Sequence, residues 1–347
     1  MHVQVLIGTY TRGTSSDGIY TAEWQTGDDR LTVMRLAARA DNPSLVLPVA
    51  RRRRVYAVNE VADRGRSGEG AICSYEHDAG RLVLRATLGS GGGLPCALAL
   101  DPTERHLAVA NYGGSVALLP LDANGDVGAR SFVVPHPKGS VHPRRQTVGH
   151  PHGVAFIDGD LWVPDLGGDA VYRYQLEGDT LVALPPLVAR VGSGPRLVVR
   201  HSALPVCYLV HELTNEVTVW RCEEQGWSIA QRVQTLAGDS AGSSAASDIR
   251  LTADGGHLYV TNRGENSLVG YAVARDGTLA AITRVATGGA HPRAFSLSPD
   301  GAWVLVANRD SNNVTVFRRN EMNGELTGPM SEHAVPAPSC IAFVPAT

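Results

Sequence analysis

Short runs of apolar and β-branched residues extend along the whole chain, and glycine, proline, asparagine or aspartate separates one run from the next. The segments 217–220 (Val-Thr-Val-Trp) and 228–231 (Ser-Ile-Ala-Gln) are two neighbouring examples. Runs of this kind between turn residues are typical of β-strands. The pattern therefore predicts an all-β protein made of many short strands and tight turns.

One pattern recurs about every 50 residues, a period typical of repeat architectures. A short apolar strand starts at a proline, a polar turn follows, and a second strand ends in asparagine or another polar residue. The second strands end at Thr9, Asn59, Asn111, Asp165, His211, Asn262 and Asn308. The first strands start near Pro43, Pro95, Pro151, Pro195, Ala246, Pro292 and Pro338. Two further β segments follow each second strand, which predicts four strands in each repeat.

The two ends of the chain complete each other. The strand from Pro338 has no second strand after it, and the strand that ends at Thr9 has no first strand before it. Pairing these two strands would cover two open edges and close a ring. We therefore predict an all-β, seven-bladed β-propeller with four-stranded antiparallel blades, formed by residues 1–347 as one domain. We expect the recurring Asn59, Asn111, Asn262 and Asn308 to close turns through hydrogen bonds.

This fold would gather residues that lie far apart in the sequence. Because neighbouring strands are antiparallel, each first strand starts at the rim where its second strand ends. The residues expected to face the channel there are Ser44, Cys96, His152, Arg196, Ser247, Arg293 and Ser339, and those just past the second strands are Tyr10, Glu60, Tyr112, Leu166, Glu212, Arg263 and Arg309. So many charged groups are costly to bury unless they pair or bind a ligand.

The predicted channel mouth suits the attack of water on an ester-like carbonyl. A carboxylate or an imidazole can activate water, while arginines hold an anion and stabilise the developing oxyanion. We assign catalysis to His152, Arg196 and Glu212, and leave open whether Glu212 or His152 is the base. We assign substrate binding to Arg263, Arg293, His150, Asp248 and Gln146. A structural ion pair between Arg196 and Glu212 is the alternative, and a loop-capping role explains His150 better than a metal site shared with His152, because no third ligand follows at a recognisable spacing.

Composition narrows the choice of partners. The formal net charge of −3 offers no basic stripe for nucleic acid or an anionic membrane, so we expect a small-molecule partner. Five cysteines without CxxC spacing predict free thiols rather than disulfides or a zinc site. Without a long apolar segment or a signal sequence, the expected location is the cytoplasm. The expected oligomeric state is a monomer or a weak dimer.

Several motifs together resemble a known family. They are Ile7-Gly8-Thr9-Tyr10-Thr11, Asn42-Pro43-Ser44, Ala110-Asn111-Tyr112-Gly113-Gly114, Arg145-Gln146 with His150-Pro151-His152, Pro164-Asp165-Leu166-Gly167, Ser193-Gly194-Pro195-Arg196, His211-Glu212-Leu213, Thr261-Asn262-Arg263-Gly264 and His291-Pro292-Arg293-Ala294-Phe295. Over nearly its whole length, the chain is similar to the seven-bladed propeller lactonases. That family includes a bacterial 6-phosphogluconolactonase and a fungal carboxymuconate-lactonising cyclase.

The resemblance implies a functional set of one His, two Arg and one Glu, which fall here on His152, Arg196, Arg263 and Glu212. It implies neither a metal nor an organic cofactor. One departure is Leu197, where the family usually has His after Gly-Pro-Arg; whether His201 compensates is open.

We therefore expect a hydrolase of carbohydrate metabolism that opens a sugar-derived lactone. The expected substrate is 6-phosphogluconolactone, an intermediate of the pentose phosphate pathway. The alternatives are cycloisomerisation of a carboxylated muconate at the same site and a non-catalytic interaction platform.

Overall fold

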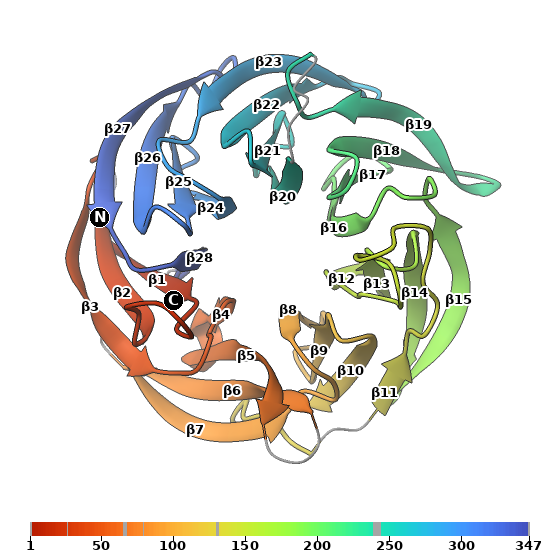
Figure 1. Ribbon diagram of the computed structural model, residues 1–347, viewed down its shortest axis with the longest axis horizontal. Coiled ribbons are helices and arrows are strands. Elements are labelled where there is room, and N and C mark those ends of the chain that lie inside the picture. The colour runs from red at the N-terminus through yellow and green to blue at the C-terminus, as the bar shows by residue number, and fades with distance from the viewer. Residues whose placement is uncertain are drawn as a thin grey trace.

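In the computed structural model, seven four-stranded antiparallel sheets stand around a central channel (Figure 1). The structure describes residues 2–345, apart from 26, 65–67, 79, 130–131 and 239–243. The predicted seven-bladed propeller is confirmed. The five cysteines are all free thiols, as their spacing predicts.

Each blade is numbered here from the innermost strand outward along the chain. Blade 1 contains β4 (Val46–Val49), β5 (Arg54–Arg64), β6 (Glu69–Asp78) and β7 (Arg81–Gly89), with the short 3₁₀ helix η1 (Ala50–Arg52) between β4 and β5. Blade 2 contains β8 (Pro95–Leu100), β9 (His106–Asn111), β10 (Ser115–Pro120) and β11 (Phe132–Pro135). Blade 3 contains β12 (Ala155–Ile157), β13 (Asp160–Asp165), β14 (Ala170–Glu177) and β15 (Thr180–Val188). Blade 4 contains β16 (Pro195–Arg200), β17 (Val206–His211), β18 (Glu216–Glu223) and β19 (Gly226–Gln234).

The remaining three blades complete the ring. Blade 5 contains β20 (Ala245–Leu251), β21 (His257–Arg263), β22 (Ser267–Val273) and β23 (Leu279–Ala286). Blade 6 contains β24 (Pro292–Leu297), β25 (Trp303–Asn308), β26 (Asn313–Arg319) and β27 (Leu326–Ala334). Blade 7 combines β28 (Pro338–Phe343) with β1 (His2–Thr9), β2 (Gly18–Gln25) and β3 (Leu31–Arg39).

Blade 7 closes the ring because it joins the two ends of the chain. Strand β28 pairs antiparallel with β1, and Ile341 lies opposite Ile7 in this pairing. The pairing leaves no open strand edge at the junction between the first and last blades, as the sequence predicts.

The innermost strands differ in length from the sequence expectation at two places. Strand β4 begins at Val46 rather than Pro43, and β12 begins at Ala155 rather than Pro151. Pro151 still forms an isolated bridge with Asp165. In other blades the register shifts just after the starting residue, as between Pro195 and Leu197. Such a bulge leaves one residue out of the ladder and turns its side chain aside, which explains why the regular strand is short or irregular here.

Apolar side chains fill the space between neighbouring blades. Trp24 of β2 and Trp303 of β25 meet edge to face, with ring centroids 5.9 Å apart, between blades 7 and 6. A similar cluster joins blades 4 and 5 around Tyr208 and Val260. Each blade therefore buries both of its faces against its neighbours, and the closed ring holds the first strands in fixed positions around the axis.

The recurring asparagines close turns, as predicted. Each side-chain amide donates to a backbone carbonyl in the loop that precedes the first strand of its own blade. The pairs are Asn59 with Asp41 (2.7 Å), Asn111 with Ser90 (2.9 Å), Asn262 with Thr235 (2.8 Å) and Asn308 with Thr287 (3.3 Å). These bonds tie each second strand to the loop that leads into the channel.

Replacing Asn262 by alanine is expected to lower the free energy of unfolding by about 1–3 kcal/mol, because the buried carbonyl of Thr235 loses a donor. Urea denaturation followed by circular dichroism measures the change. The exposed Asn124 provides the matched control, and its alanine variant is expected to change stability by less than about 0.5 kcal/mol. Equal effects of the two changes would contradict the proposed role of the recurring asparagines.

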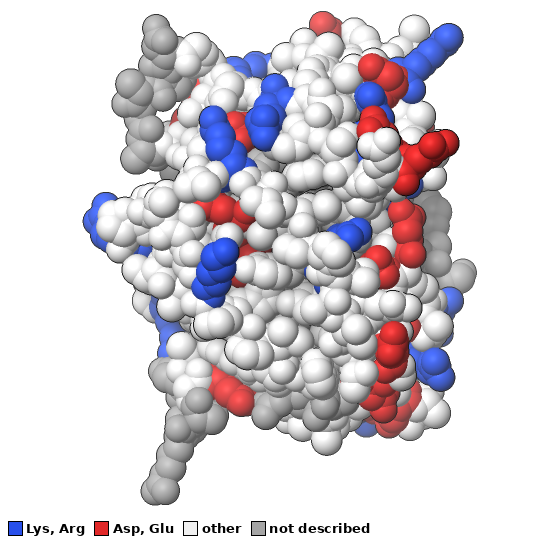
Figure 2. All heavy atoms as spheres, turned by 90° about the vertical axis from the view of Figure 1, so that its right-hand side faces the viewer, with Lys and Arg blue, Asp and Glu red and all other residues white. Residues whose placement is uncertain are grey.

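Charged side chains on the rim of the wheel are mixed in sign. On the side shown in Figure 2, basic and acidic residues are scattered among uncharged ones, and acidic residues gather along one edge. Among the described residues, no helix has the length and apolar character needed to cross a membrane.

Candidate active site

The central channel contains a cavity of about 200 Å³. All seven residues that the sequence predicts to face the channel line this cavity: Ser44, Cys96, His152, Arg196, Ser247, Arg293 and Ser339. They share a position at or just before the start of an innermost strand, where the ladder is irregular. The prediction that these positions face the axis is confirmed.

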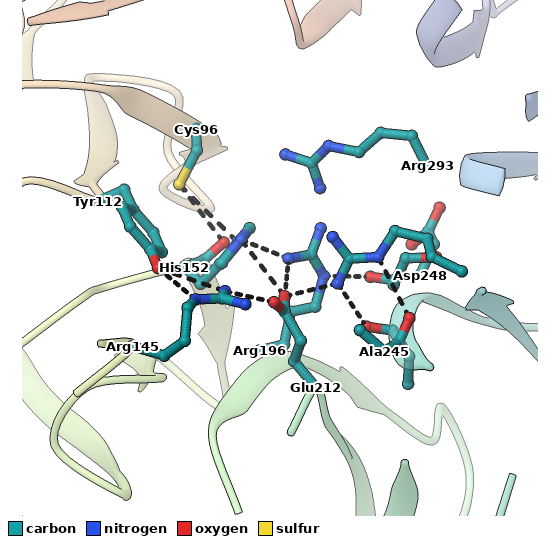
Figure 3. Close-up of polar contacts among 12 residues, drawn as sticks. Cys96, Tyr112, Arg145, His152, Arg196, Glu212, Ala245, Asp248 and Arg293 are labelled. Carbon is teal, nitrogen blue, oxygen red and sulfur yellow. Dashed lines mark hydrogen bonds and ion pairs between the residues drawn. The ribbon is translucent and has the colours of Figure 1, made fainter. Parts of the chain in front are cut away.

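Glu212 lies at the centre of a cluster of three arginines (Figure 3). Its Oε2 atom contacts Arg196 and lies 2.8 Å from Nη2 of Arg263, and its Oε1 atom contacts Arg145. Glu212 follows the last residue of β17, Arg196 belongs to β16 of the same blade, and Arg263 ends β21 of the next blade. The backbone carbonyls of Ala245 and Ala246 accept hydrogen bonds from Arg263 and fix its direction.

Burial makes this cluster unusual. The side chain of Glu212 is 0% exposed and that of Arg196 only 2% exposed, whereas that of Arg145 is 38% exposed. Burial alone would raise the pKa of Glu212, but the charges of Arg263 and Arg145 and the hydrogen bond from Arg145 outweigh it, so the pKa is lowered. Glu212 is therefore an ionised carboxylate whose two oxygens both face guanidinium groups.

His152 is a neutral imidazole in this setting. Burial, together with the charges of Arg293 and Arg263, lowers its pKa to about 3 against the opposing effect of Glu212. A guanidinium has only donors, so the contact between Arg196 and Nε2 of His152 requires Nε2 to accept and the ring proton to lie on Nδ1. Nε2 also lies 3.9 Å from Glu212.

A second polar group lies on the other side of the channel mouth. Glu60 accepts a hydrogen bond of 2.8 Å from the hydroxyl of Tyr10 and contacts the hydroxyl of Ser44. Arg293 lies 3.2 Å from the same Tyr10 hydroxyl through Nη2. Figure 3 shows its guanidinium entering the space opposite Arg196 without a contact to the Glu212 cluster. Among the described residues, no carboxylate forms an ion pair with Arg293.

The structure brings four predicted site residues into mutual contact: His152, Arg196, Glu212 and Arg263. Arg293 lies opposite them. Arg196 also donates through Nε to the backbone carbonyl of Ser247, so its Nε and Nη1 atoms are both engaged with protein groups. This geometry gives Arg196 the task of holding Glu212 and His152 in place.

The other three predicted substrate-binding residues have local partners instead. The amide of Gln146 donates to the carbonyl of Leu166 and accepts from the backbone of His142, inside its own loop. Asp248 lines the cavity but pairs with Arg250 and with backbone amides, including that of Phe295 in the next blade.

Nδ1 of His150 lies 2.6 Å from the carbonyl of Tyr112, and its ring stacks on that tyrosine. The loop-capping alternative weighed for His150 is therefore the one its contacts support. In the described part of the chain, no group of three or more His, Cys, Asp or Glu side chains is arranged to hold a metal ion.

Two residues of the cluster were not assigned to the site from sequence. Arg145 lies in the long connection between β11 and β12, and the hydroxyl of Tyr112 lies 3.3 Å from its Nη2 atom. The motif around Arg145 and Gln146 was the available signal, but it does not say which of the two side chains points to the channel. His201 lies beyond the other end of β16 and accepts from backbone amides of its turn, so it does not compensate for Leu197.

Comparison with known proteins shows which family the chain resembles. The model of a family described as "Lactonase, 7-bladed beta-propeller" matches residues 4–343. A 6-phosphogluconolactonase of Bacillus subtilis is 31% identical over 97% of both chains. A periplasmic gluconolactonase of Pseudomonas aeruginosa superimposes with a TM-score of 0.93 at 32% identity, over 99% of both chains.

A putative 6-phosphogluconolactonase of Bacteroides fragilis has a TM-score of 0.90 at 28% identity, over 99% of this chain and 98% of that one. The expectation of a lactone hydrolase is confirmed at the level of the family. With its closed ring of seven blades and a match over nearly its full length, the chain belongs to the seven-bladed β-propeller lactonase family.

Proposed function

We propose that the protein hydrolyses a sugar-derived lactone that carries a negative charge, and that its substrate is 6-phosphogluconolactone. The observation that carries this proposal is the charge balance of the channel mouth. Four guanidiniums, those of Arg145, Arg196, Arg263 and Arg293, face two carboxylates, those of Glu60 and Glu212. The mouth therefore has an excess of positive charge that favours an anionic ligand.

The arginines differ in what they can offer a substrate. Arg196 is buried and holds Glu212, His152 and the Ser247 carbonyl through Nε and Nη1, whereas Arg145 and Arg263 are partly exposed at the mouth and Arg293 faces the cavity without a carboxylate partner. We therefore assign the phosphate to Arg145 and Arg263, and the lactone carbonyl to Arg293. A guanidinium with free donors can form charge-assisted hydrogen bonds both to a phosphate and to a developing oxyanion.

The names of the relatives support the same substrate class. Among them are a 6-phosphogluconolactonase and a gluconolactonase, so the unsettled point is whether the phosphate is required. The cytoplasmic location expected from the sequence stays a prediction, since one of these relatives is periplasmic. We also propose that residues 1–347 act as a single domain.

The direct test compares kcat/KM for phosphorylated and unphosphorylated gluconolactone. We expect the phosphorylated lactone to be preferred at least about tenfold, which corresponds to about 1.4 kcal/mol of transition-state stabilisation. The preference should weaken as salt is added, because the mouth is open to solvent. Rates no faster than spontaneous hydrolysis with either lactone would contradict the proposal. A pH-stat also separates hydrolysis, which releases a proton, from cycloisomerisation.

Replacing Arg263 by glutamine is expected to reduce the preference for the phosphorylated lactone by roughly tenfold, because one charge-assisted contact is lost. The ratio of the two kcat/KM values measures this effect independently of overall activity. Arg318, which stacks on Trp303 away from the channel, provides the matched control. A ratio that changes equally in the Arg263→Gln and Arg318→Gln variants would argue against a phosphate contact at Arg263.

A further inference from the structure

Glu60 and Glu212 occupy corresponding places in two blades of the ring. Glu212 follows His211 at the end of β17, and Glu60 follows Asn59, where the pairing of β5 with β6 becomes irregular. Blade 1 and blade 4 stand on different sides of the channel (Figure 1). The repeat therefore places two carboxylates at the same mouth, facing the same space from different directions.

The partners of the two carboxylates are very different. Both oxygens of Glu212 contact guanidinium groups. The partners of Glu60 are two neutral hydroxyls, those of Tyr10 and Ser44, and both bind its Oε2 atom. Within the described residues, no arginine forms an ion pair with Glu60, and its Oε1 atom has no protein donor. Glu60 is half-buried, and its partner Ser44 lines the channel cavity.

The two base candidates assigned from sequence are less suited to accept a proton. Glu212 would have to take up a proton beside three positive charges, which is unfavourable. His152 directs the lone pair of Nε2 at Arg196. A general base needs a free lone pair within hydrogen-bond reach of the water that it activates. Of these three groups, only Glu60 has one.

Tyr10 connects Glu60 to the guanidinium that faces the cavity. Its hydroxyl donates to Glu60 at 2.8 Å, and Nε and Nη2 of Arg293 lie 3.3 and 3.2 Å from the same oxygen. Burial raises the pKa of Tyr10 to about 12, so the phenol keeps its proton and can serve as donor to the carboxylate. Two hydrogen bonds thus fix the spacing between a free carboxylate oxygen and a guanidinium without a carboxylate partner.

We propose that Glu60 is the general base of lactone hydrolysis and that Arg293 stabilises the oxyanion, an inference that rests on the proposed function. Glu60 takes a proton from water as the water oxygen forms a bond to the carbonyl carbon. The carbonyl electron pair moves onto its oxygen beside Arg293. When the carbonyl re-forms, the bond to the ring oxygen breaks, and the proton on Glu60 passes to that oxygen. The products are a hydroxyl group and a carboxylic acid, which releases the second proton of the water to solvent.

Tyr10 and Ser44 are positioning residues in this arrangement, because they act on the substrate only through Glu60 and Arg293. Removing the Tyr10 hydroxyl takes away the hydrogen bond to Oε2 of Glu60 and the link between Glu60 and Arg293. A Tyr10→Phe variant is therefore expected to lower kcat with little change in KM. A purely structural role for Tyr10 would lower the folded fraction and leave kcat of the folded enzyme unchanged.

The main test is the Glu60→Gln variant. Glutamine keeps an oxygen that can accept from Tyr10 and Ser44 but cannot take up the proton, so kcat is expected to fall by about 100- to 1,000-fold with little change in KM. Binding of the product 6-phosphogluconate, measured by calorimetry, should stay within about threefold of the wild type. Glu104→Gln, a surface carboxylate that pairs with Arg51 and Arg52, is the matched control.

A Glu60→Asp variant covers the case in which the glutamine variant does not fold. It keeps the carboxylate but withdraws it by one methylene, and kcat is expected to lie between those of the wild type and Glu60→Gln. An active wild type with a Glu60→Gln rate within threefold of it would overturn the assignment of Glu60 and leave the proposed function standing. A wild type that accelerates no lactone would overturn both.

Discussion

Replacing Glu212 by glutamine is expected to lower the free energy of unfolding by about 3–5 kcal/mol, because the buried guanidinium of Arg196 and the partly exposed ones of Arg263 and Arg145 are left around a neutral side chain. Burying a charge without a partner costs more than an ordinary ion pair contributes. Chemical denaturation at neutral pH measures the change. The same variant is expected to lose activity, since Arg196 and Arg263 would separate without the anion between them.

A double-mutant cycle tests whether the loss of stability comes from the uncompensated charges rather than from any substitution in the channel. Adding Arg196→Met to Glu212→Gln removes one of the uncompensated charges, so the double variant should be less destabilised than the sum of the two single variants. Glu104→Gln is again the control, because its two arginines are partly exposed and such pairs contribute less than about 1 kcal/mol. Similar losses of unfolding free energy for Glu212→Gln and Glu104→Gln would show that the buried cluster stabilises the protein no more than a surface ion pair does.

The architecture could be predicted because the repeat marks both ends of the innermost strand pairs. A proline starts the first strand in four blades, as β8, β16, β24 and β28 show, and Asn111, His211 or Asn308 ends a second strand where the sequence places it. Antiparallel geometry then determines which rim each residue occupies. The strand register alone therefore predicts that one group of residues lies together, and no detail of side-chain packing is needed. The group consists of His152, Arg196, Glu212 and Arg263.

Residues outside the repeat could not be located in the same way. Arg145 reaches Glu212 from the loop between β11 and β12, where no strand register tells which side chains face the axis. The same limit applies to Gln146, whose amide binds the carbonyl of Leu166 past β13 and the backbone of His142. Asp248 lines the channel as its position suggests, but its partners, Arg250 and two backbone amides, depend on a local bulge.

Equivalent positions in a repeat also need not have equivalent chemistry. Glu60 and Glu212 were both placed at the rim from sequence, yet one binds two hydroxyls and the other three guanidiniums. The difference arises from the side chains that neighbouring blades contribute, Tyr10 and Ser44 in one case and Arg145 and Arg263 in the other. Differences of a few ångströms in side-chain position determine which carboxylate keeps a free lone pair. Such positions can be read only from the structure.

Two buried histidines are expected to make the protein less stable in mild acid. The pKa of His211 is lowered to about 3 by burial and by Arg190, and that of His152 is lowered to about 3 by burial, Arg293 and Arg263. An unfolded histidine has a pKa near 6.5, so below this pH the unfolded chain takes up protons that the folded chain does not bind. The stability that the two neutral histidines contribute is therefore fully present above about pH 6.5. It is lost progressively as the pH falls towards 3.

At pH 5 each of these histidines should cost about 2 kcal/mol relative to pH 7.5. Denaturation curves between pH 5 and 7.5 report this loss apart from that of Glu212, whose lowered pKa matters only below the ordinary pKa of a glutamate, although His291, His201, His257, His77 and His333, whose pKa values are also lowered, add to the slope. His211 binds Ser193 and Thr218 away from the channel mouth, so His211→Gln should remove its own share, about 2 kcal/mol, of the loss at pH 5. The exposed His2 supplies the control, and equal slopes in His2→Gln and His211→Gln would show that buried His211 does not cause the acid sensitivity.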